Sequence, residues 1–249
     1  MPGSFRLNSG VCSPVDLPLL PKRNHPEGMA LVLAAHSEGA YLAAAVRCAV
    51  EALRALQVQA VPVELVLVLH GADGATGEAA AQLRRRCAVP LRLLKRHRHG
   101  QAQAWQAGIR HTRQAWIALG TVDDLLAPNW LNAVTTAIGA QAEGSARCSV
   151  FHPRALFCFE NEQQLQLLPD QGELDHPLAA LLSQELWPGS CVAHRSVFRV
   201  CPLQPVASTL PPALGNVLWN WHCRSLQAGF VHQALDGTCQ FRRQRAAVG

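Results

Sequence analysis

The sequence lacks the long apolar runs, paired cysteines and targeting signals that define several protein classes. No apolar run approaches the ~18–20 residues of a membrane helix, and the start, MPGSFRLNSGVCSP, lacks the charged-then-apolar order of a signal peptide. We therefore expect a cytoplasmic protein. Nine cysteines are spread singly, with no C-x-x-C pair and no matching Cys/His spacing, which argues against a structural zinc site.

Charge is sparse and slightly positive. The formal net charge is +5, and the basic residues gather in Arg84–Arg86 and in the segment 91–99. No aromatic residues interleave with these charges and no nucleic-acid motif accompanies them, so we expect no nucleic-acid partner. A solvated helix face is the first interpretation; the alternatives are nucleotide phosphate or peripheral contact with the anionic inner face of a membrane.

Regular alternation of strand and helix patterns begins at Met29. Residues 1–28 are rich in proline and aperiodic, which is typical of a flexible tail, and Met29 is an alternative start of translation. The apolar periodicity predicts strands at 29–35, 63–70, 89–96 and 115–119, and helices at 40–56, 78–87, 101–112 and 129–140. Such alternation predicts a parallel sheet with right-handed crossovers.

The second half of the chain is less regular. Its patterns predict strands at 148–159, 190–198 and 232–243 and a helix at 216–228. No internal repeat or low-complexity linker divides the chain, and with 49% apolar residues one domain can form a sizeable core. We therefore expect a single domain over residues 29–249.

Two adjacent acids follow the apolar strand WIAL. Asp123 and Asp124 come where the chain emerges at the carboxyl end of that strand, the usual ligand-binding edge of open α/β sheets. Carboxylates here either ligate a metal or cap the helix that begins after Pro128. We favour metal ligation for Asp123 and capping for Asp124.

Ordered blocks across the chain resemble family-2 nucleotide-sugar glycosyltransferases with the GT-A fold. The blocks are HSEGAYL, VELVLVLHGADGAT, QAGIRHTRQAWIALGTVDDLLAPNWL, WPGSCVAHRSVF and LWNWHCRSLQAGF. The resemblance implies a Rossmann-like α/β fold, with a mostly parallel sheet flanked by helices and a smaller mixed portion on the acceptor side. It also implies a nucleotide-sugar half at about 29–126 and an acceptor half at about 127–249.

The activity implied by the resemblance is inverting transfer of a sugar from a nucleotide-diphosphate donor. The acceptor stays open between a glycan, a lipid-linked carrier and a small molecule. By the same resemblance, Asp123 ligates Mg²⁺ or Mn²⁺ at the donor diphosphate. The residues that the resemblance assigns to donor binding are Ala34, His36, Glu38, His70, Thr121 and Asp123.

Several polar positions depart from the family pattern. Leu69, with His70 beside it, replaces an acid that reads the nucleotide base, Thr121 replaces the first acid of D-x-D, and Trp105-Gln106 replaces Arg-Asn. No Asp or Glu lies between Glu185 and Asp236, where the family supplies its catalytic base. The substitute bases are His194, His222 and Glu185. The alternative function is a catalytically inactive GT-A scaffold that binds carbohydrate, nucleotide or a partner protein.

Overall fold

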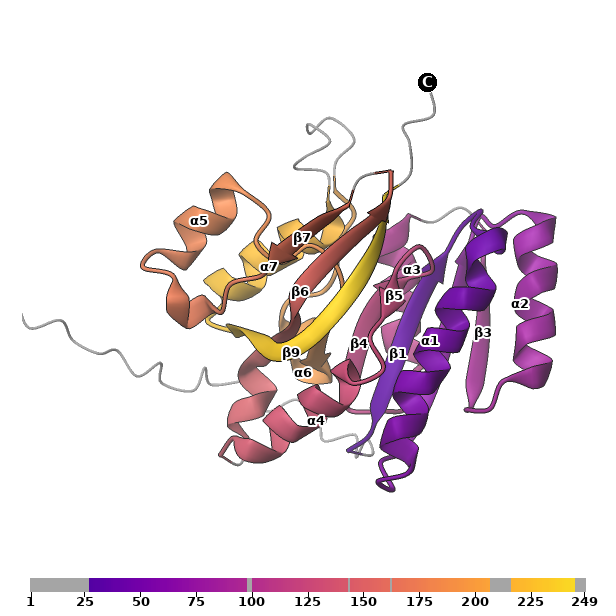
Figure 1. Ribbon diagram of the computed structural model, residues 1–249, viewed down its shortest axis with the longest axis horizontal. Coiled ribbons are helices and arrows are strands. Elements are labelled where there is room, and N and C mark those ends of the chain that lie inside the picture. The colour runs from indigo at the N-terminus through magenta and orange to yellow at the C-terminus, as the bar shows by residue number, and fades with distance from the viewer. Residues whose placement is uncertain (1–26, 98–99, 143, 162, 207–215, 245–249) are drawn as a thin grey trace, which may run out of the picture.

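The structure, a computed structural model, describes residues 27–97, 100–142, 144–161, 163–206 and 216–244 (Figure 1). Most of the expected tail and the segment just before residue 216 lie outside these ranges. The strands are β1 Met29–Ala35, β2 Val63–His70, β3 Leu91–Arg96, β4 Trp116–Thr121, β5 Leu125–Leu126, β6 Ser149–Glu160, β7 Gln164–Leu167, β8 Cys191–His194 and β9 Val231–Gln244. The helices are α1 Gly39–Gln57, α2 Gly74–Arg86, α3 Gln101–His111, α4 Trp130–Ala140, α5 Pro177–Ser183, α6 Arg195–Val200 and α7 Val217–Gln227, with 3-10 turns at Ser145–Cys148 and Gln171–Glu173.

The first half of the chain forms a parallel sheet in the order β3-β2-β1-β4. In its register Ala34 of β1 lies between Val68 of β2 and Thr121 of β4. The carboxyl ends of these strands therefore meet at one edge. The loops that follow β1, β2 and β4 all leave from that edge.

The second half continues the same sheet with mixed strand directions. Strand β8 runs antiparallel to β4, β6 runs antiparallel to β8, and β9 runs parallel to β6. Long β6 and β9 curl away from the flat parallel part in Figure 1, and β7 pairs with the outer edge of β6. The expected parallel sheet with a smaller mixed portion is therefore present.

Short strand β5 brings the end of the chain to the two acids. It directly follows Asp124, and its Leu125 pairs with Phe241 of β9 in antiparallel register. The basic residues Arg242 and Arg243 come next on β9. Two segments more than a hundred residues apart in sequence therefore lie side by side at the carboxyl edge.

Strands β1, β2 and β4 are buried on both faces, which explains their nearly continuous apolar composition. Leu31, Leu33 and their neighbours on one face pack with α1, α2 and α4, whereas Val32 and Ala34 on the other face pack with α3, α6 and α7. A third apolar cluster joins β6, α5 and α7. Helix α7 therefore lies between two cores and is fixed on both sides.

Two local predictions are wrong. Residues 190–198 are not one strand, because β8 ends at His194 and α6 begins at Arg195. The His194 ring accepts a hydrogen bond from the Ser196 amide, and the buried guanidinium of Arg195 donates to the carbonyl of Ile109, so both side chains stabilise the turn into a helix. Helix α2 begins at Gly74 rather than at 78, since Asp73 caps it by accepting from the Thr76 amide.

Two helical glycines make a matched test of the close packing of α3 on the sheet. A Cβ added at Gly108 would lie 2.2 Å from Val32 Cγ1, whereas at Gly139 of α4 nothing lies within 4 Å. We expect Gly108→Ala to lower the free energy of unfolding by about 1–3 kcal/mol, because α3 must move off the sheet. Gly139→Ala is expected to raise it by about 0.5–1 kcal/mol. Urea unfolding measures both free energies. If Gly108→Ala unfolded with the wild-type free energy, close packing of α3 on the sheet would be contradicted.

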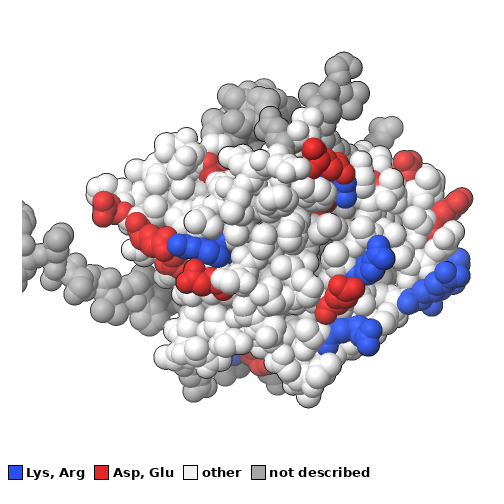
Figure 2. Space-filling model, in the orientation of Figure 1, with Lys and Arg blue, Asp and Glu red and all other residues white. Residues whose placement is uncertain are grey.

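The surface is mostly uncharged. In Figure 2 most of the basic side chains on this face lie over the α1–α2 side, with acidic groups among them. Arg84 and Arg85 of α2, with Lys95 of β3, line a shallow groove on that part of the fold. Among the described residues, no helix is both long and apolar enough to cross a membrane.

Candidate active site

An open cleft with a volume of about 490 Å³ lies at the carboxyl end of β4. Its walls come from the starts of α3 and α7, the loop before β8 and the end of β9, while β4 and the following turn form its floor. Clefts of this size at this edge of a parallel sheet are the usual ligand sites of α/β folds.

Thr121, Asp123 and Asp124 all line this cleft. Burial raises the pKa of Asp124 to about 6, and the charge of Asp123 adds to the rise while that of Arg242 opposes it. The predicted capping role of Asp124 is wrong: α4 begins six residues later with Asn129 at its cap, and the Asp124 carboxylate accepts from Gln240 Nε2 at 2.7 Å. Two neighbouring carboxylates that repel each other in a partly desolvated cleft favour a bound cation.

Gln240 of β9 fixes two walls of the cleft. While its amide nitrogen donates to Asp124, its Oε1 accepts from the Ser190 amide at 2.7 Å. Gly189 passes so close that an added Cβ would lie 2.6 Å from Gln240 Oε1, and its φ of +117° also favours glycine. The fully buried Gln240 therefore holds the acid turn and the loop before β8 in a fixed relation.

Two arginines from β9 supply positive charge. Arg243 pairs with Glu160, and its guanidinium lies 4.1 Å from the centre of the Tyr41 ring. Arg242 also lines the cleft, and its charge acts on both Asp124 and Glu185. Guanidinium groups bind phosphate through paired N–H donors, so this wall suits an anionic ligand.

Glu185 is connected to the cleft wall by a hydrogen bond from Asn216. Asn216 Nδ2 donates to Glu185 Oε1 at 2.7 Å, and Asn216 Oδ1 caps α7 by accepting from the amides of Leu218 and Trp219. Asn216 lines the cleft, at the point where the family pattern has its base. Burial raises the pKa of Glu185, and the charge of Arg242 offsets part of that rise.

The structure does not bring the other two base candidates to this cleft. His194 pairs with Trp116, the first residue of β4, so it lies at the opposite end of that strand from Thr121. His222 is fully buried in α7, and burial lowers the pKa of its ring to about 3. Glu185, by contrast, is joined to the cleft wall by the hydrogen bond from Asn216.

A second group lies at the same sheet edge, after β1 and β2. The rings of His36 and His70 stack with their centres 5.3 Å apart, and His36 Nδ1 lies 2.6 Å from the His70 carbonyl oxygen. Glu38 stands at the cap position of α1, but its carboxylate accepts from the His36 amide. Ala34 is buried inside the sheet, and its carbonyl accepts from the Val122 amide.

The residues that replace the family's polar pairs have become structural. Trp105 is buried at the cleft wall and donates from Nε1 to the Gly120 carbonyl at 2.8 Å, which fixes the end of β4. Gln106 accepts from the Leu203 amide. Leu69 is buried in β2 and contributes only apolar surface. At Trp105 and Leu69, buried apolar side chains thus stand where the family pattern has a guanidinium and a carboxylate.

The side chains of the cleft can hold a cation through oxygen atoms. The carboxylates of Asp123 and Asp124 with the Thr121 hydroxyl are oxygen ligands of the kind that Mg²⁺ and Mn²⁺ prefer, so the residues fit such an ion. Arg242 provides a fixed cation. Neither it nor Gln240 was predicted from the sequence, because each reaches the cleft only through the pairing of β9 with β5 and β6.

Two solved structures with a similar fold are complexes with nucleotide sugars. The chain is similar to S. aureus TarS 1-349 in complex with UDP-GlcNAc, with 8% identity and a TM-score of 0.61 over 88% of this chain and 59% of that one. It is also similar to the mannosyltransferase PcManGT from Pyrobaculum calidifontis in complex with GDP-Man and Mn²⁺, with 14% identity and a TM-score of 0.58 over 95% of this chain and 62% of that one. The chain thus spans less than two thirds of either protein.

Sequence comparison gives the family directly. No curated protein matches the chain. The profile of Glycosyl transferase family 2, however, matches residues 30–165, which is more than half of the chain and includes β2, β3, β4 and all of β1 after Met29. This match agrees with the ordered sequence blocks, the GT-A topology and the cleft at the carboxyl end of β4. The chain belongs to glycosyltransferase family 2.

Proposed function

We propose that this protein transfers a sugar from a nucleotide-diphosphate donor to an acceptor, with inversion at the anomeric carbon. The observation that carries the proposal is the cleft in which Asp123 and Asp124 face Arg242. The carboxylates offer oxygen ligands to Mg²⁺ or Mn²⁺, and the guanidinium offers donors to phosphate. A bound divalent ion would neutralise diphosphate charge as the leaving group departs.

Each of the two groups of polar residues is proposed to bind a different part of the donor. The stacked rings of His36 and His70 present an imidazole surface beside the ends of β1 and β2, suited to a nucleotide base, with Glu38 alongside. The diphosphate then lies towards Thr121 and Asp123, because Thr121 and Ala34 are neighbours in the sheet. The sugar would extend towards the start of α7.

Glu185 is the proposed base. An inverting transfer needs a group that accepts the proton of the acceptor hydroxyl as that oxygen attacks. The raised pKa of the Glu185 carboxyl moves it towards the neutral range in which a base works best, and its hydrogen bond from Asn216, a residue of the cleft wall, supports this role. A glycan, a lipid-linked carrier and a small molecule all stay open as acceptors.

The second candidate is a scaffold that binds its ligand without chemistry. It is favoured by the three exchanged polar positions at Leu69, Thr121 and Asn216, since no carboxylate stands at any of them. In that case donor binding persists without turnover. Binding and transfer must therefore be measured separately.

Thermal shift tests the binding half of the proposal. We expect a nucleotide-diphosphate sugar with Mn²⁺ to raise the melting temperature, by an amount equivalent to about 2.7 kcal/mol at 100 times the dissociation constant. A panel of UDP-, GDP- and other nucleotide-linked sugars identifies the donor. In Asp123→Asn the shift is expected to disappear, because a neutral amide is a poor ligand for the ion.

A matched control lies outside the cleft. Asp175 is exposed and is not among the cleft residues, so Asp175→Asn should keep the full shift. If no donor in the panel stabilises the wild-type protein with Mn²⁺ or Mg²⁺ present, the proposed nucleotide-sugar site does not exist.

A further inference from the structure

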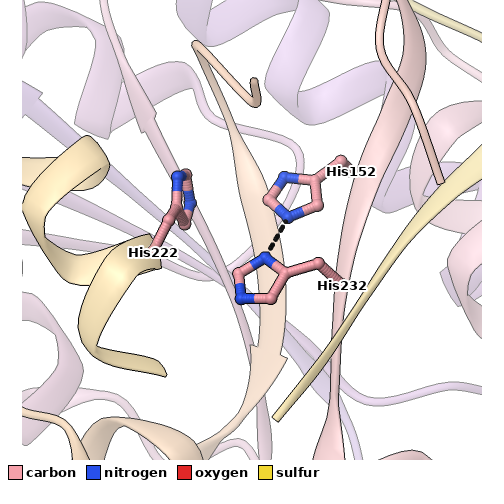
Figure 3. A group of neighbouring side chains, drawn as sticks. All are labelled: His152, His222 and His232. Atoms are coloured by element: carbon pink, nitrogen blue, oxygen red, sulfur yellow. Dashed lines mark hydrogen bonds between the residues drawn. The ribbon is translucent and has the colours of Figure 1, made fainter. Parts of the chain in front are cut away.

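Three histidines meet inside the second half of the fold, away from the cleft. His152 lies on β6, His222 on α7 and His232 on β9, and all three are completely buried. One ring nitrogen from each lies within 4.8 Å of the others. Figure 3 shows His222 projecting from its helix towards the pair formed by His152 and His232.

Some ring nitrogens of this cluster make no hydrogen bond. His152 Nε2 lies 2.9 Å from His232 Nδ1, and His232 Nε2 lies 3.0 Å from Ser225 Oγ. His152 Nδ1 and both ring nitrogens of His222 have no hydrogen-bond partner, although all three are buried. A neutral imidazole always carries one N–H, so His222 buries a donor that nothing satisfies, an arrangement that native cores avoid unless water or an ion completes it.

We propose that His152, His222 and His232 form a binding site for a divalent transition-metal ion of the zinc class. Three imidazole nitrogens are a common ligand set for zinc, with Zn–N distances of about 2.0–2.1 Å, which separate tetrahedral ligands by about 3.3 Å. The observed spacing, from 2.9 Å within one pair to less than 4.8 Å overall, needs only small side-chain rotations to reach it. A water completes the fourth position.

Ser225 already orients one ligand. Its hydroxyl donates to the His222 carbonyl at 3.0 Å, so it accepts from His232 Nε2 and leaves the lone pair of His232 Nδ1 directed at the cluster. Metal-bound histidines commonly donate their second ring nitrogen in this way. Trp187 stacks on both His152 and His232, with ring centres 5.2 and 4.4 Å apart, and restricts their rotation.

The three histidines and the cleft should prefer different metal ions, because their ligand atoms differ. Burial lowers the pKa of all three histidines, so the rings are neutral and ready to coordinate at physiological pH. Neutral imidazoles suit zinc, whereas Mg²⁺ and Mn²⁺ prefer the carboxylates of the cleft. The ion would join α7 to β6 and β9, and so fix the helix whose cap, Asn216, forms part of the cleft wall.

Metal analysis of the purified protein tests the site. We expect about one equivalent of zinc per chain, a lower melting temperature after chelation and recovery on adding Zn²⁺. His222→Phe, which fills the same space without a ligand, is expected to lose the bound zinc and the response to chelator. His176→Asn, at an exposed position on the cap of α5, should keep both. Asp123→Asn should also keep both, which separates this site from the proposed function.

A second variant guards against simple misfolding of the first. Ser225→Ala keeps all three imidazoles but frees His232, and we expect zinc affinity to fall about 10–100-fold. Cobalt substitution should give visible bands of a four-coordinate ion without a sulfur charge-transfer band, which excludes binding by the cysteines. The proposal is overturned if chelated and zinc-loaded wild type melt at the same temperature, or if His222→Phe retains the metal.

Discussion

Glu185→Gln is expected to lower the rate of sugar transfer by about 10²–10⁴-fold, the usual contribution of a general base. The glutamine keeps the shape of the side chain and can still accept from Asn216 Nδ2 through its own oxygen. The cap of α7, which depends on Asn216 Oδ1, therefore stays intact. Donor affinity, read by thermal shift, should be unchanged, so that the loss appears in kcat alone.

The matched experiment exchanges the carboxylate and the amide between positions 185 and 216. In the double variant Glu185→Gln with Asn216→Asp, the hydrogen-bonded pair keeps one amide and one carboxylate, but the carboxylate moves onto the cleft wall. Aspartate also caps helices well, so α7 should form as before. We expect this variant to recover much of the lost rate. If Glu185→Gln transfers sugar at the wild-type rate, Glu185 is not the base; if wild type binds donor but never transfers, the scaffold interpretation holds.

Asp124→Asn is expected to stabilise the protein, with an effect that grows with pH. The folded pKa of Asp124, about 6, exceeds its ordinary value of 3.8, so the folded state binds more protons between these values. The free energy of unfolding therefore falls as pH rises through this window, by at most about 3 kcal/mol for a shift of about two units. Asparagine can still accept from Gln240. The difference in free energy of unfolding between the variant and the wild type should therefore vanish below about pH 4 and reach its full size above about pH 7.

The control for this pH dependence is Asp73, a carboxylate whose pKa is lowered rather than raised in the folded protein. Hydrogen bonding to Thr76, whose amide donates to the carboxylate, lowers the pKa of Asp73, so Asp73→Asn should remove stability above pH 4 rather than add it. Chemical denaturation at several pH values measures both differences. Mn²⁺ with donor should shrink the advantage of Asp124→Asn, because a cation favours the ionised carboxylate. An advantage independent of pH would contradict a desolvated, ionisable Asp124.

The fold was predictable because its signal is local and repeated. Strands buried on both faces give continuous apolar runs, and helices packed on one side give apolar residues at intervals of three and four, so each alternation shows directly in the sequence. The same patterns carried the resemblance to family 2, which the profile match over residues 30–165 confirms. The error at 190–198 arose where a buried arginine, Arg195, starts a helix among residues that otherwise favour a strand.

The site was predictable only in part. Asp123 follows a recognisable buried strand, and its position in the cleft accords with that reasoning. Its role there stays a prediction, as do those of His36, Glu38 and His70. His194 and His222 were chosen as residue types suited to base work, and sequence carries no distance by which to reject them.

By itself, the sequence determined the strand–helix alternation, the family and the turn that carries Asp123, because these depend on neighbours along the chain. The tertiary structure decided which distant groups share a space. Strand β9 brings Gln240 and Arg242 to the acids through its pairing with β5, and the packing of α7 against β6 and β9 collects three histidines from positions 152, 222 and 232. Contacts between segments so far apart follow from sheet register and helix packing, which local periodicity does not encode.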